Sequence, residues 1–147
     1  MNQFRRLSAT MLASPQIGLG DIAEAKALGV TLIVNNRPEG ESNDQAPGPE
    51  IEAAARAAGM GYLAIPVTHS GFSHPQVAAL AEVLERTEGP VLGYCRSGTR
   101  STLLWALARA SLGEEPDALA AAAAQAGYDL GPVRAAVDAL AAQARSA

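Results

Sequence analysis

The only cysteine of this 147-residue chain, Cys95, begins a short polar run that could bind an anion. The run reads Cys95-Arg96-Ser97-Gly98-Thr99-Arg100-Ser101. It follows a β-prone segment and leads into a helix-compatible one, so several backbone N–H groups can converge on one point. Such a nest, with the positive end of a helix dipole behind it, binds anions and lowers the pKa of a thiol. The sequence therefore predicts a nucleophile and an anion-binding loop within a single turn.

The individual residues of this loop predict separate roles. Arg100 offers a planar fork of donors and is predicted to bind the oxyanion of a substrate. Ser101 is predicted to donate its hydroxyl to the thiolate, or else to be an ordinary residue of the first helical turn. Gly98 is predicted to supply a positive φ angle or a close approach of backbone to the anion. The other members of the anion-binding loop are Arg96, Ser97 and Thr99.

A structural role for the cysteine is the alternative, because a lone cysteine is most often a small buried hydrophobe. Its neighbours argue against that role. Buried charges need partners, and a cysteine that only fills a core has no use for Arg96 and Arg100 close beside it. The composition of the loop therefore favours a catalytic Cys95.

The hydrophobic pattern predicts which elements position this loop. Asp21 followed by Glu24 indicates a capping box at a helix start, and Ser73 with Gln76 indicates another. Strands are predicted over residues 7–17, 30–34, 62–67 and 91–94, and the first of these is a short strand or an extended lead-in. Helices are predicted over residues 21–28, 49–58 and 99–112, after residue 73, and from about 116 and 132.

This alternation predicts a single α/β domain over residues 1–147, with a mostly parallel central sheet, flanking helices and a helical C-terminus. Ligands of such sheets bind at the carboxyl ends of the strands. Three predicted strands are followed by polar loops, at residues 35–39, 68–71 and 95–100. We expect these loops to meet at one pocket with Cys95 at its floor.

Composition excludes several other classes of protein. The chain carries a formal net charge of −4 and only 4% aromatic residues, which argues against binding nucleic acid. One cysteine and two histidines, His69 and His74, do not build a zinc site, and no metal or other cofactor is expected. No apolar run approaches the length of a membrane span or of a signal-peptide core, so a soluble cytoplasmic protein is expected. The sequence leaves the oligomeric state open, because it shows no heptad pattern and no exposed apolar stripe.

The loop resembles the active-site loop of cysteine-dependent phosphatases and of rhodaneses. Over about residues 4–130 the chain resembles the phosphatase-like domain of bacterial beta-lactamase hydrolase-like proteins. That resemblance implies a dual-specificity-phosphatase-like fold, in a family described both as phosphatase-like and as sulfur transferase. Three further stretches carry the likeness: Ser14-Pro15-Gln16, Asn35-Asn36-Arg37-Pro38-Glu39-Gly40-Glu41 and Ile65-Pro66-Val67-Thr68.

The resemblance also suggests residues around the nucleophile. In dual-specificity phosphatases the loop after the equivalent strand carries an aspartate that protonates the leaving group. His69 stands at that position here, either as a substitute general acid or as a solvated loop residue. Arg37 and Glu39 are predicted to lie at the rim of the site, or else to belong to a solvated loop.

Two features favour sulfur transfer over phosphate-ester hydrolysis as the chemistry. Four residues separate Cys95 from Arg100, as in many rhodaneses, whereas the cysteine phosphatases have five. No Asp or Glu occurs between Ala53 and Ala81, so the expected acid loop lacks a carboxylate. The predicted substrate is a small anion, namely a persulfide, thiosulfate or a phosphomonoester. The alternatives are a phosphatase acting through phosphocysteine and a non-catalytic module that binds phosphate or sulfate.

Overall fold

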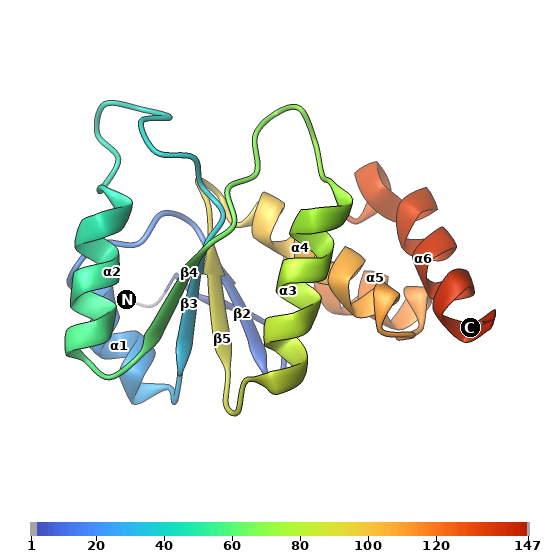
Figure 1. The fold of residues 1–147 in the computed structure, drawn as a ribbon, viewed down its shortest axis with the longest axis horizontal. Coiled ribbons are helices and arrows are strands. Elements are labelled where there is room, and N and C mark those ends of the chain that lie inside the picture. Colours follow the sequence, from blue (N-terminus) through green and yellow to red (C-terminus); the bar gives the residue numbers. More distant parts are fainter. Residues whose placement is uncertain (1–2, 147) are drawn as a thin grey trace.

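A continuous apolar run makes Val91–Tyr94 the central strand, β5, of a five-stranded sheet, because all four of its residues are buried. The computed structural model describes residues 3–146 (Figure 1). The order of the strands is β1-β2-β5-β3-β4. The other strands are β1 (Arg5–Ser8), β2 (Met11–Ser14), β3 (Leu32–Asn35) and β4 (Gly61–Ala64).

Four of the strands run parallel and end at the same edge of the sheet. Tyr94, at the end of β5, is paired with Ser14 of β2 on one side and with Asn35 of β3 on the other. Asn35 is in turn paired with Ala64 of β4. Only β1 is antiparallel to its neighbour. The loops that follow β2, β3, β4 and β5 therefore meet, as the sequence predicts.

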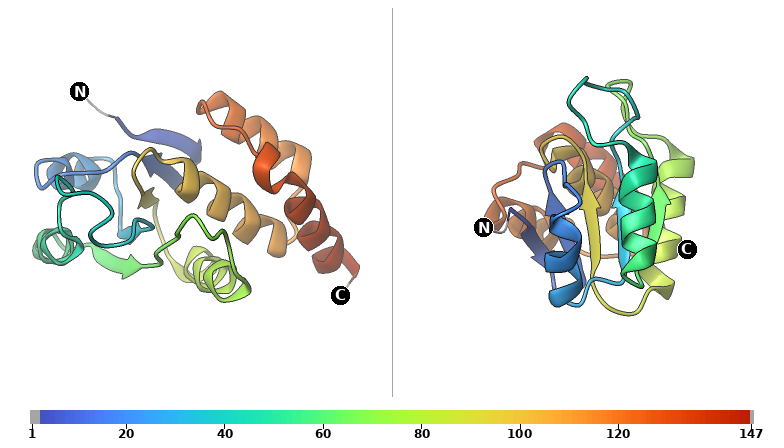
Figure 2. Two further views of the ribbon diagram at one scale, coloured as in Figure 1. Left: turned by 90° about the horizontal axis from the view of Figure 1, so that it is seen from above. Right: turned by 90° about the vertical axis from the view of Figure 1, so that its left-hand side faces the viewer.

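Helices cover both faces of the sheet (Figures 1 and 2). One face carries α1 (Asp21–Ala27) and α2 (Gly48–Ala57), and the other carries α3 (His74–Arg86) and α4 (Thr99–Ser111). Beyond α4 lie α5 (Pro116–Gln125), the 3₁₀ turn Gly131–Val133 and α6 (Arg134–Ser146). The α/β fold class, the mostly parallel sheet and the helical C-terminus are therefore confirmed.

Alternation along the strands divides the core into two clusters. Met11 and Ala13 of β2 pack with α3 and α4, whereas Leu12 packs with α1 and α2. Side chains of a strand point alternately to the two faces, so a sheet covered on both sides needs apolar residues at nearly every position. Helix α4 is buried along most of its length because it is enclosed by the sheet, α3, α5 and α6.

The N-terminal strand is where the prediction was wrong. Residues 5–14 form a hairpin of two strands instead of one extended segment. Its turn contains no glycine, proline or asparagine to signal it. Instead, Ser8 Oγ accepts a hydrogen bond from Thr10 N at 3.2 Å, and Arg6 Nη1 donates to the Ser8 and Ala9 carbonyls. The Ser8 side chain thus stabilises the turn through a hydrogen bond to the backbone.

The two predicted capping boxes had opposite outcomes. At α3, Ser73 Oγ accepts from Gln76 N and the Gln76 side chain accepts from Ser73 N, so this box is confirmed. The box at Asp21 is wrong: Gly20 is the N-cap of α1, without a side-chain cap. The Asp21 carboxylate instead accepts from Gly18 N at 2.8 Å, in the turn that leads into the helix.

Within residues 3–146 no helix is long and apolar enough to cross a bilayer. Over the same residues no group of three or more His, Cys, Asp or Glu side chains is arranged to hold a metal ion.

Candidate active site

Cys95 lies directly beyond the C-terminal end of β5, at the centre of the edge where the parallel strands end. Its backbone N–H donates to the Ser14 carbonyl at 3.3 Å, which ties it to the end of β2. The residue is fully buried. It therefore lies at the floor of the region that the polar loops surround, as predicted.

The loop from Cys95 to Arg100 turns back on its own sulfur. Gly98 N lies 3.1 Å from Cys95 Sγ and donates to it, so one loop amide points at the sulfur. Gly98 has φ +93° and is the N-cap of α4, which confirms the predicted left-handed backbone. Thr102 Oγ1 and Thr102 N both donate to the Gly98 carbonyl, so the first turn of α4 fixes this conformation. The start of α4 thus lies directly behind the sulfur, where its dipole favours an anion.

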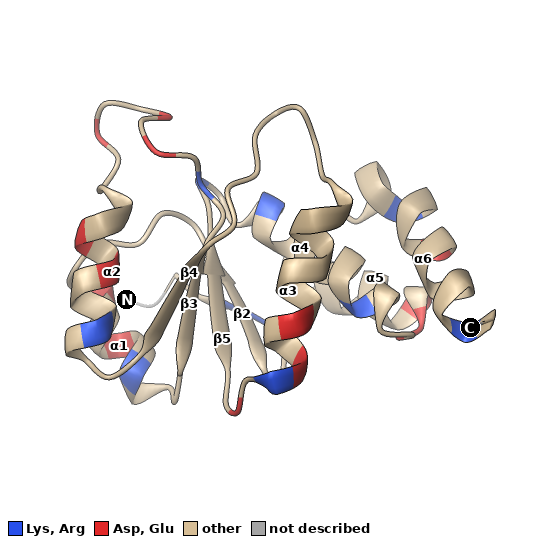
Figure 3. Ribbon diagram, in the orientation of Figure 1, with Lys and Arg blue, Asp and Glu red and all other residues tan. Residues whose placement is uncertain are grey.

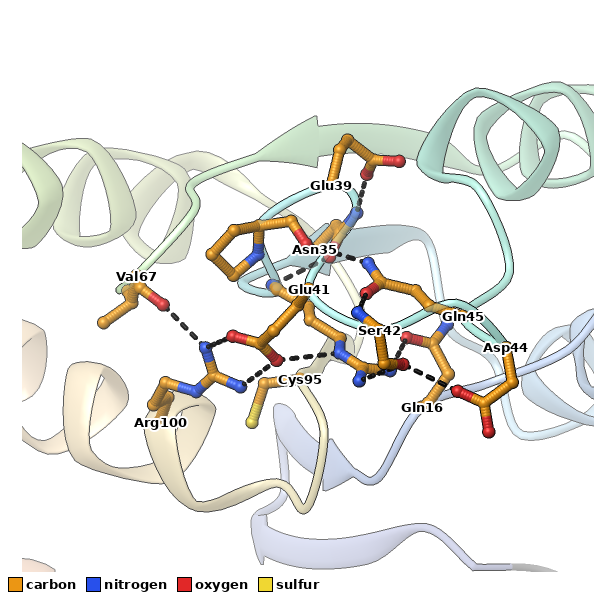
Figure 4. Close-up of polar contacts among 12 residues, drawn as sticks. Gln16, Asn35, Glu39, Glu41, Ser42, Asp44, Gln45, Val67, Cys95 and Arg100 are labelled. Atoms are coloured by element: carbon orange, nitrogen blue, oxygen red, sulfur yellow. Dashed lines mark hydrogen bonds and ion pairs between the residues drawn. The ribbon is translucent and has the colours of Figure 1, made fainter. Parts of the chain in front are cut away.

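Arg100 makes contacts that the sequence did not indicate. Its Nη1 and Nη2 donate to the two carboxylate oxygens of Glu41, at 2.7 and 2.8 Å, in a bidentate ion pair (Figure 4). Nη1 also donates to the Val67 carbonyl at 2.7 Å. The pKa of Arg100 is raised, chiefly by these bonds to Glu41 and more weakly by the charge of the nearby Cys95. The predicted oxyanion-binding arginine is therefore close to Cys95 and held by three hydrogen bonds.

Glu41 also bonds a second arginine. Its Oε1 accepts from Arg37 Nε at 2.9 Å, and the pKa of Glu41 is lowered to about 2, first by the hydrogen bonds from Arg100. Arg37 is only 5% exposed, so it is no solvated loop residue. Its other two nitrogens donate to Gln16 Oε1 and Ser42 Oγ, both at 3.0 Å. Arg37 thus ties the loop of residues 38–47, through Glu41 and Ser42, to Gln16 after β2.

Ser101 is fully buried and donates its hydroxyl to Asn36 Oδ1 at 2.7 Å. In this arrangement the hydroxyl proton points to Asn36 and not to the sulfur. Asn36 Nδ2 donates to the Ile65 carbonyl, and the Asn36 carbonyl accepts from Val67 N. Asn36 therefore joins the ends of β3 and β4 to the start of α4, and the predicted bond from Ser101 to the thiolate stays a prediction.

The remaining predicted residues lie further from the chemistry. His69 is exposed, and within residues 3–146 it has no hydrogen bond or ion pair, so its role as an acid stays a prediction. Glu39 accepts from Gly48 N at 2.8 Å, which places its carboxylate at the start of α2 and away from Arg100 (Figure 4). Arg96 and Ser97 are exposed on the outer side of the loop, and Thr99 N bonds Ser97 Oγ.

Sequence reasoning missed Glu41 and Tyr128. The Tyr128 hydroxyl donates to the Ser97 carbonyl at 3.2 Å and packs against Gly98. Nothing in the sequence places Tyr128, from the segment after α5, near Cys95. Glu41 lies in a loop, where its spacing of four residues from Arg37 indicates no pairing, so nothing in the sequence singled it out.

Comparison with known proteins decides the family. Residues 3–112 match the phosphatase-like domain of the beta-lactamase hydrolase-like protein. The chain belongs to this family. It is 39% identical over 105 residues to the beta-lactamase hydrolase-like protein of Xylella fastidiosa strain Temecula1, an alignment that covers 70% of this chain and 24% of that protein. The chain therefore spans about a quarter of the length of the curated relatives it matches.

Solved structures resemble this phosphatase-like domain over nearly its whole length. The crystal structure of a candidate phosphatase from Neisseria meningitidis Z2491 has a TM-score of 0.82 and 31% identity, and covers 95% of this chain and 99% of that one. Pseudomonas aeruginosa TpbA, solved as a variant in complex with pTyr, has a TM-score of 0.68 and 20% identity, and covers 99% and 91% of the two chains. At that identity the second likeness shows the fold alone. The family match and the Neisseria structure support the phosphatase alternative and lend no support to the predicted sulfurtransferase.

Proposed function

We propose that this domain is a cysteine-dependent phosphatase whose preferred substrates are phosphomonoesters of acidic alcohols, phenols above all. The observation that carries the proposal is the placement of the Cys95 sulfur. It lies at the end of the central strand, with the Gly98 amide 3.1 Å away, α4 behind it and Arg100 beside it. Such a site provides a nucleophile and donors for a tetrahedral dianion.

The proposed reaction has two steps and needs only the Cys95 thiolate, the phosphomonoester and water. The Cys95 thiolate attacks the phosphorus, the S–P bond forms, and the P–O bond to the leaving group breaks with its electron pair on the departing oxygen. Water then attacks the phosphocysteine, which releases inorganic phosphate and restores the thiolate. Loop amides and Arg100 would stabilise the equatorial oxygens in both steps, where charge is spread over the phosphoryl group.

The preference for phenols follows from the carboxylates near the site. Figure 3 shows acidic residues in the loop between β3 and α2 and none in the loop between β4 and α3. Glu41, the carboxylate bonded to Arg100, has its pKa lowered to about 2 and is ionised at neutral pH, so it has no proton to give. General acid catalysis contributes typically 10²–10⁴-fold, and a site without it depends on a leaving group that departs unaided.

A leaving-group series tests this proposal. Aryl phosphates whose phenols span several pKa values should show kcat/KM falling steeply as the phenol becomes less acidic, and alkyl phosphates should be turned over far more slowly. Cys95→Ser should abolish turnover of every member. A flat dependence with rapid alkyl-phosphate hydrolysis would show that a general acid operates, with His69 the first residue to replace.

Two further measurements on the wild-type protein test the alternatives, sulfur transfer and non-catalytic anion binding. Incubation with thiosulfate followed by intact-mass measurement detects a persulfide on Cys95, as the four-residue spacing before Arg100 led us to expect. Persulfide formation without aryl-phosphate turnover would establish sulfur transfer and refute the phosphatase. Binding of phosphate with neither reaction would leave a non-catalytic anion-binding module.

A further inference from the structure

We propose that Glu41 is the positioning residue of this site: it holds the Arg100 guanidinium so that its remaining donors face an anion bound over Cys95. The proposal rests on the proposed function only in taking Arg100 as the group that binds the anion. Glu41 itself touches no substrate and acts through Arg100.

A count of the Arg100 protons shows which edge of the guanidinium is free. Nη1 has two N–H groups, and they go to Glu41 Oε2 and to the Val67 carbonyl, each at 2.7 Å. One N–H of Nη2 goes to Glu41 Oε1 at 2.8 Å. The second N–H of Nη2 and the single N–H of Nε remain, and these two are the parallel pair that binds one oxyanion in bidentate fashion.

The free edge lies toward the nucleophile. Figure 4 draws Glu41 and Cys95 on different sides of the Arg100 guanidinium. The charge of Cys95 contributes to the raised pKa of Arg100, which indicates that the two groups are close. An anion on the sulfur can therefore bind Nε and Nη2 while the bonds to Glu41 and Val67 stay intact. This geometry makes Glu41 a support for the bound state and not a competitor for the arginine.

Glu41 is itself held from behind. Arg37 donates to it at 2.9 Å and is almost completely buried, with Gln16 and Ser42 bonding its other two nitrogens. Two arginines and one glutamate leave a net charge of +1 in this cluster, so the carboxylate does not cancel the attraction for an anion. Arg37 therefore both fixes the carboxylate and offsets its charge.

Glu41→Asp is the informative variant, because it keeps the charge beside Arg37 and Arg100 but is one methylene too short to reach both. Orthovanadate, which binds cysteine as an analogue of the transferring phosphoryl group, is the probe. It is titrated against the rate of Cys95 alkylation by iodoacetamide, while p-nitrophenyl phosphate reports turnover. We expect vanadate protection to weaken about tenfold or more and kcat to fall about tenfold to a hundredfold, with KM little changed, since misplacing a catalytic group costs that much.

The Arg100→Lys background separates positioning from a structural role. If Glu41 acts through Arg100, Glu41→Asp should change vanadate affinity and kcat less than about twofold there, because the fork it orients is gone. Glu52→Asp is the matched control, since it shortens a glutamate in the exposed pair with Arg56 on α2. Melting temperatures of all variants, and Glu41→Gln as a second replacement, show whether an effect comes from loss of folding.

Three results with the variants would overturn the proposal. One is full vanadate affinity and turnover in Glu41→Asp, and another is an equal loss in both backgrounds. The third is a gain in either quantity, which would make Glu41 an inhibitory occupant of Arg100. Wild-type protein that vanadate fails to protect would also refute it, because Arg100 would then bind no anion. Protection that depends on Glu41 without any turnover would instead refute the phosphatase proposal alone.

Discussion

Arg100 shows how strongly the function of one residue depends on its shape. Lysine carries the same charge, but it is a point charge without a planar fork. Arg100 uses that fork toward Glu41, and under our proposal its other edge binds the anion. No single ammonium group can hold both partners in that geometry.

We therefore expect Arg100→Lys to lower kcat with p-nitrophenyl phosphate by on the order of a hundredfold or more, the usual cost of losing a transition-state donor. Steady-state kinetics beside the wild type measures the effect. Arg86→Lys on α3, in an exposed pair with Glu82, is the control and should leave the rate unchanged. Undiminished turnover in Arg100→Lys would remove Arg100 from the chemistry.

Glu41 predicts an acid-sensitive contribution to stability. Its pKa falls from 4.5 to about 2 on folding, so between these values the unfolded chain binds the proton and the folded chain does not. The ion pairs with Arg100 and Arg37 therefore stabilise the fold fully above about pH 4.5. That stabilisation is lost progressively as the pH falls through 2.

Urea denaturation between pH 7 and pH 2 tests this prediction with Glu41→Gln. The variant should be less stable than the wild type at pH 7, by on the order of 1 kcal/mol after allowance for solvent screening. The difference should shrink toward pH 2. Glu88→Gln, at an exposed position of the loop between α3 and β5 and without a side-chain ion pair in residues 3–146, should follow the wild type at every pH. A constant gap across the range would contradict the assignment.

At the scale of elements, the anion loop depends on Gly98 for two reasons. Its φ of +93° is strained for any residue with a Cβ, and a Cβ there would overlap the Tyr128 hydroxyl. Gly59, which ends α2 with φ +85°, has open space around the same position. Comparing alanine substitutions at Gly98 and Gly59 therefore separates the free-energy cost of the backbone conformation from that of the steric overlap.

Gly98→Ala should lower the melting temperature more than Gly59→Ala, which pays only the backbone term of about 1 kcal/mol. It should also reduce turnover of p-nitrophenyl phosphate strongly, because the Gly98 amide that points at Cys95 Sγ would move. Differential scanning calorimetry and steady-state kinetics measure the two effects. Equal melting temperatures for the two variants would show that the contact with Tyr128 is too soft to matter.

At the scale of the molecule, the segment between α5 and α6 contacts the anion-binding loop through Tyr128. Tyr128 lies between α5 and α6, beyond the part of the chain that matches the family. Its hydroxyl bonds the Ser97 carbonyl, and the Arg5 guanidinium of β1 lies 5.9 Å from its ring centroid. The part of the chain after α4 thus contacts the anion-binding loop through Tyr128 and also covers α4.

This contact predicts a specific rescue. Tyr128→Phe removes the hydroxyl that a Cβ at residue 98 would meet, so Gly98→Ala should be less damaging in that background. In a double-mutant cycle the two changes should couple by on the order of 1 kcal/mol, as residues in contact do. Calorimetry on the four proteins measures the coupling. Simple additivity would mean that the loop shifts away from Tyr128 without cost.

Local chemistry explains what the sequence determined by itself. The strand–loop–helix around Cys95, the left-handed Gly98 and the capping box at Ser73 depend on neighbours within a few residues. Alternating strands and helices then leave few topologies, and parallel strands must end at one edge. The position of Cys95, the nearby Arg100 and the convergence of the polar loops were therefore predictable.

Tertiary structure alone decided which side chains complete the site. Glu41 lies 59 residues from Arg100, and Tyr128 lies 31 residues from Ser97. Loop residues such as Glu39 and Glu41 carry the same charge two positions apart, yet one caps α2 and the other binds Arg100. Loops lack the regular residue spacing that predicts side-chain contacts in helices and strands. The partner of a loop carboxylate therefore depends on where the folded backbone brings two charges within hydrogen-bond distance. That is why Arg100 could be predicted and its ion-pair partner Glu41 could not.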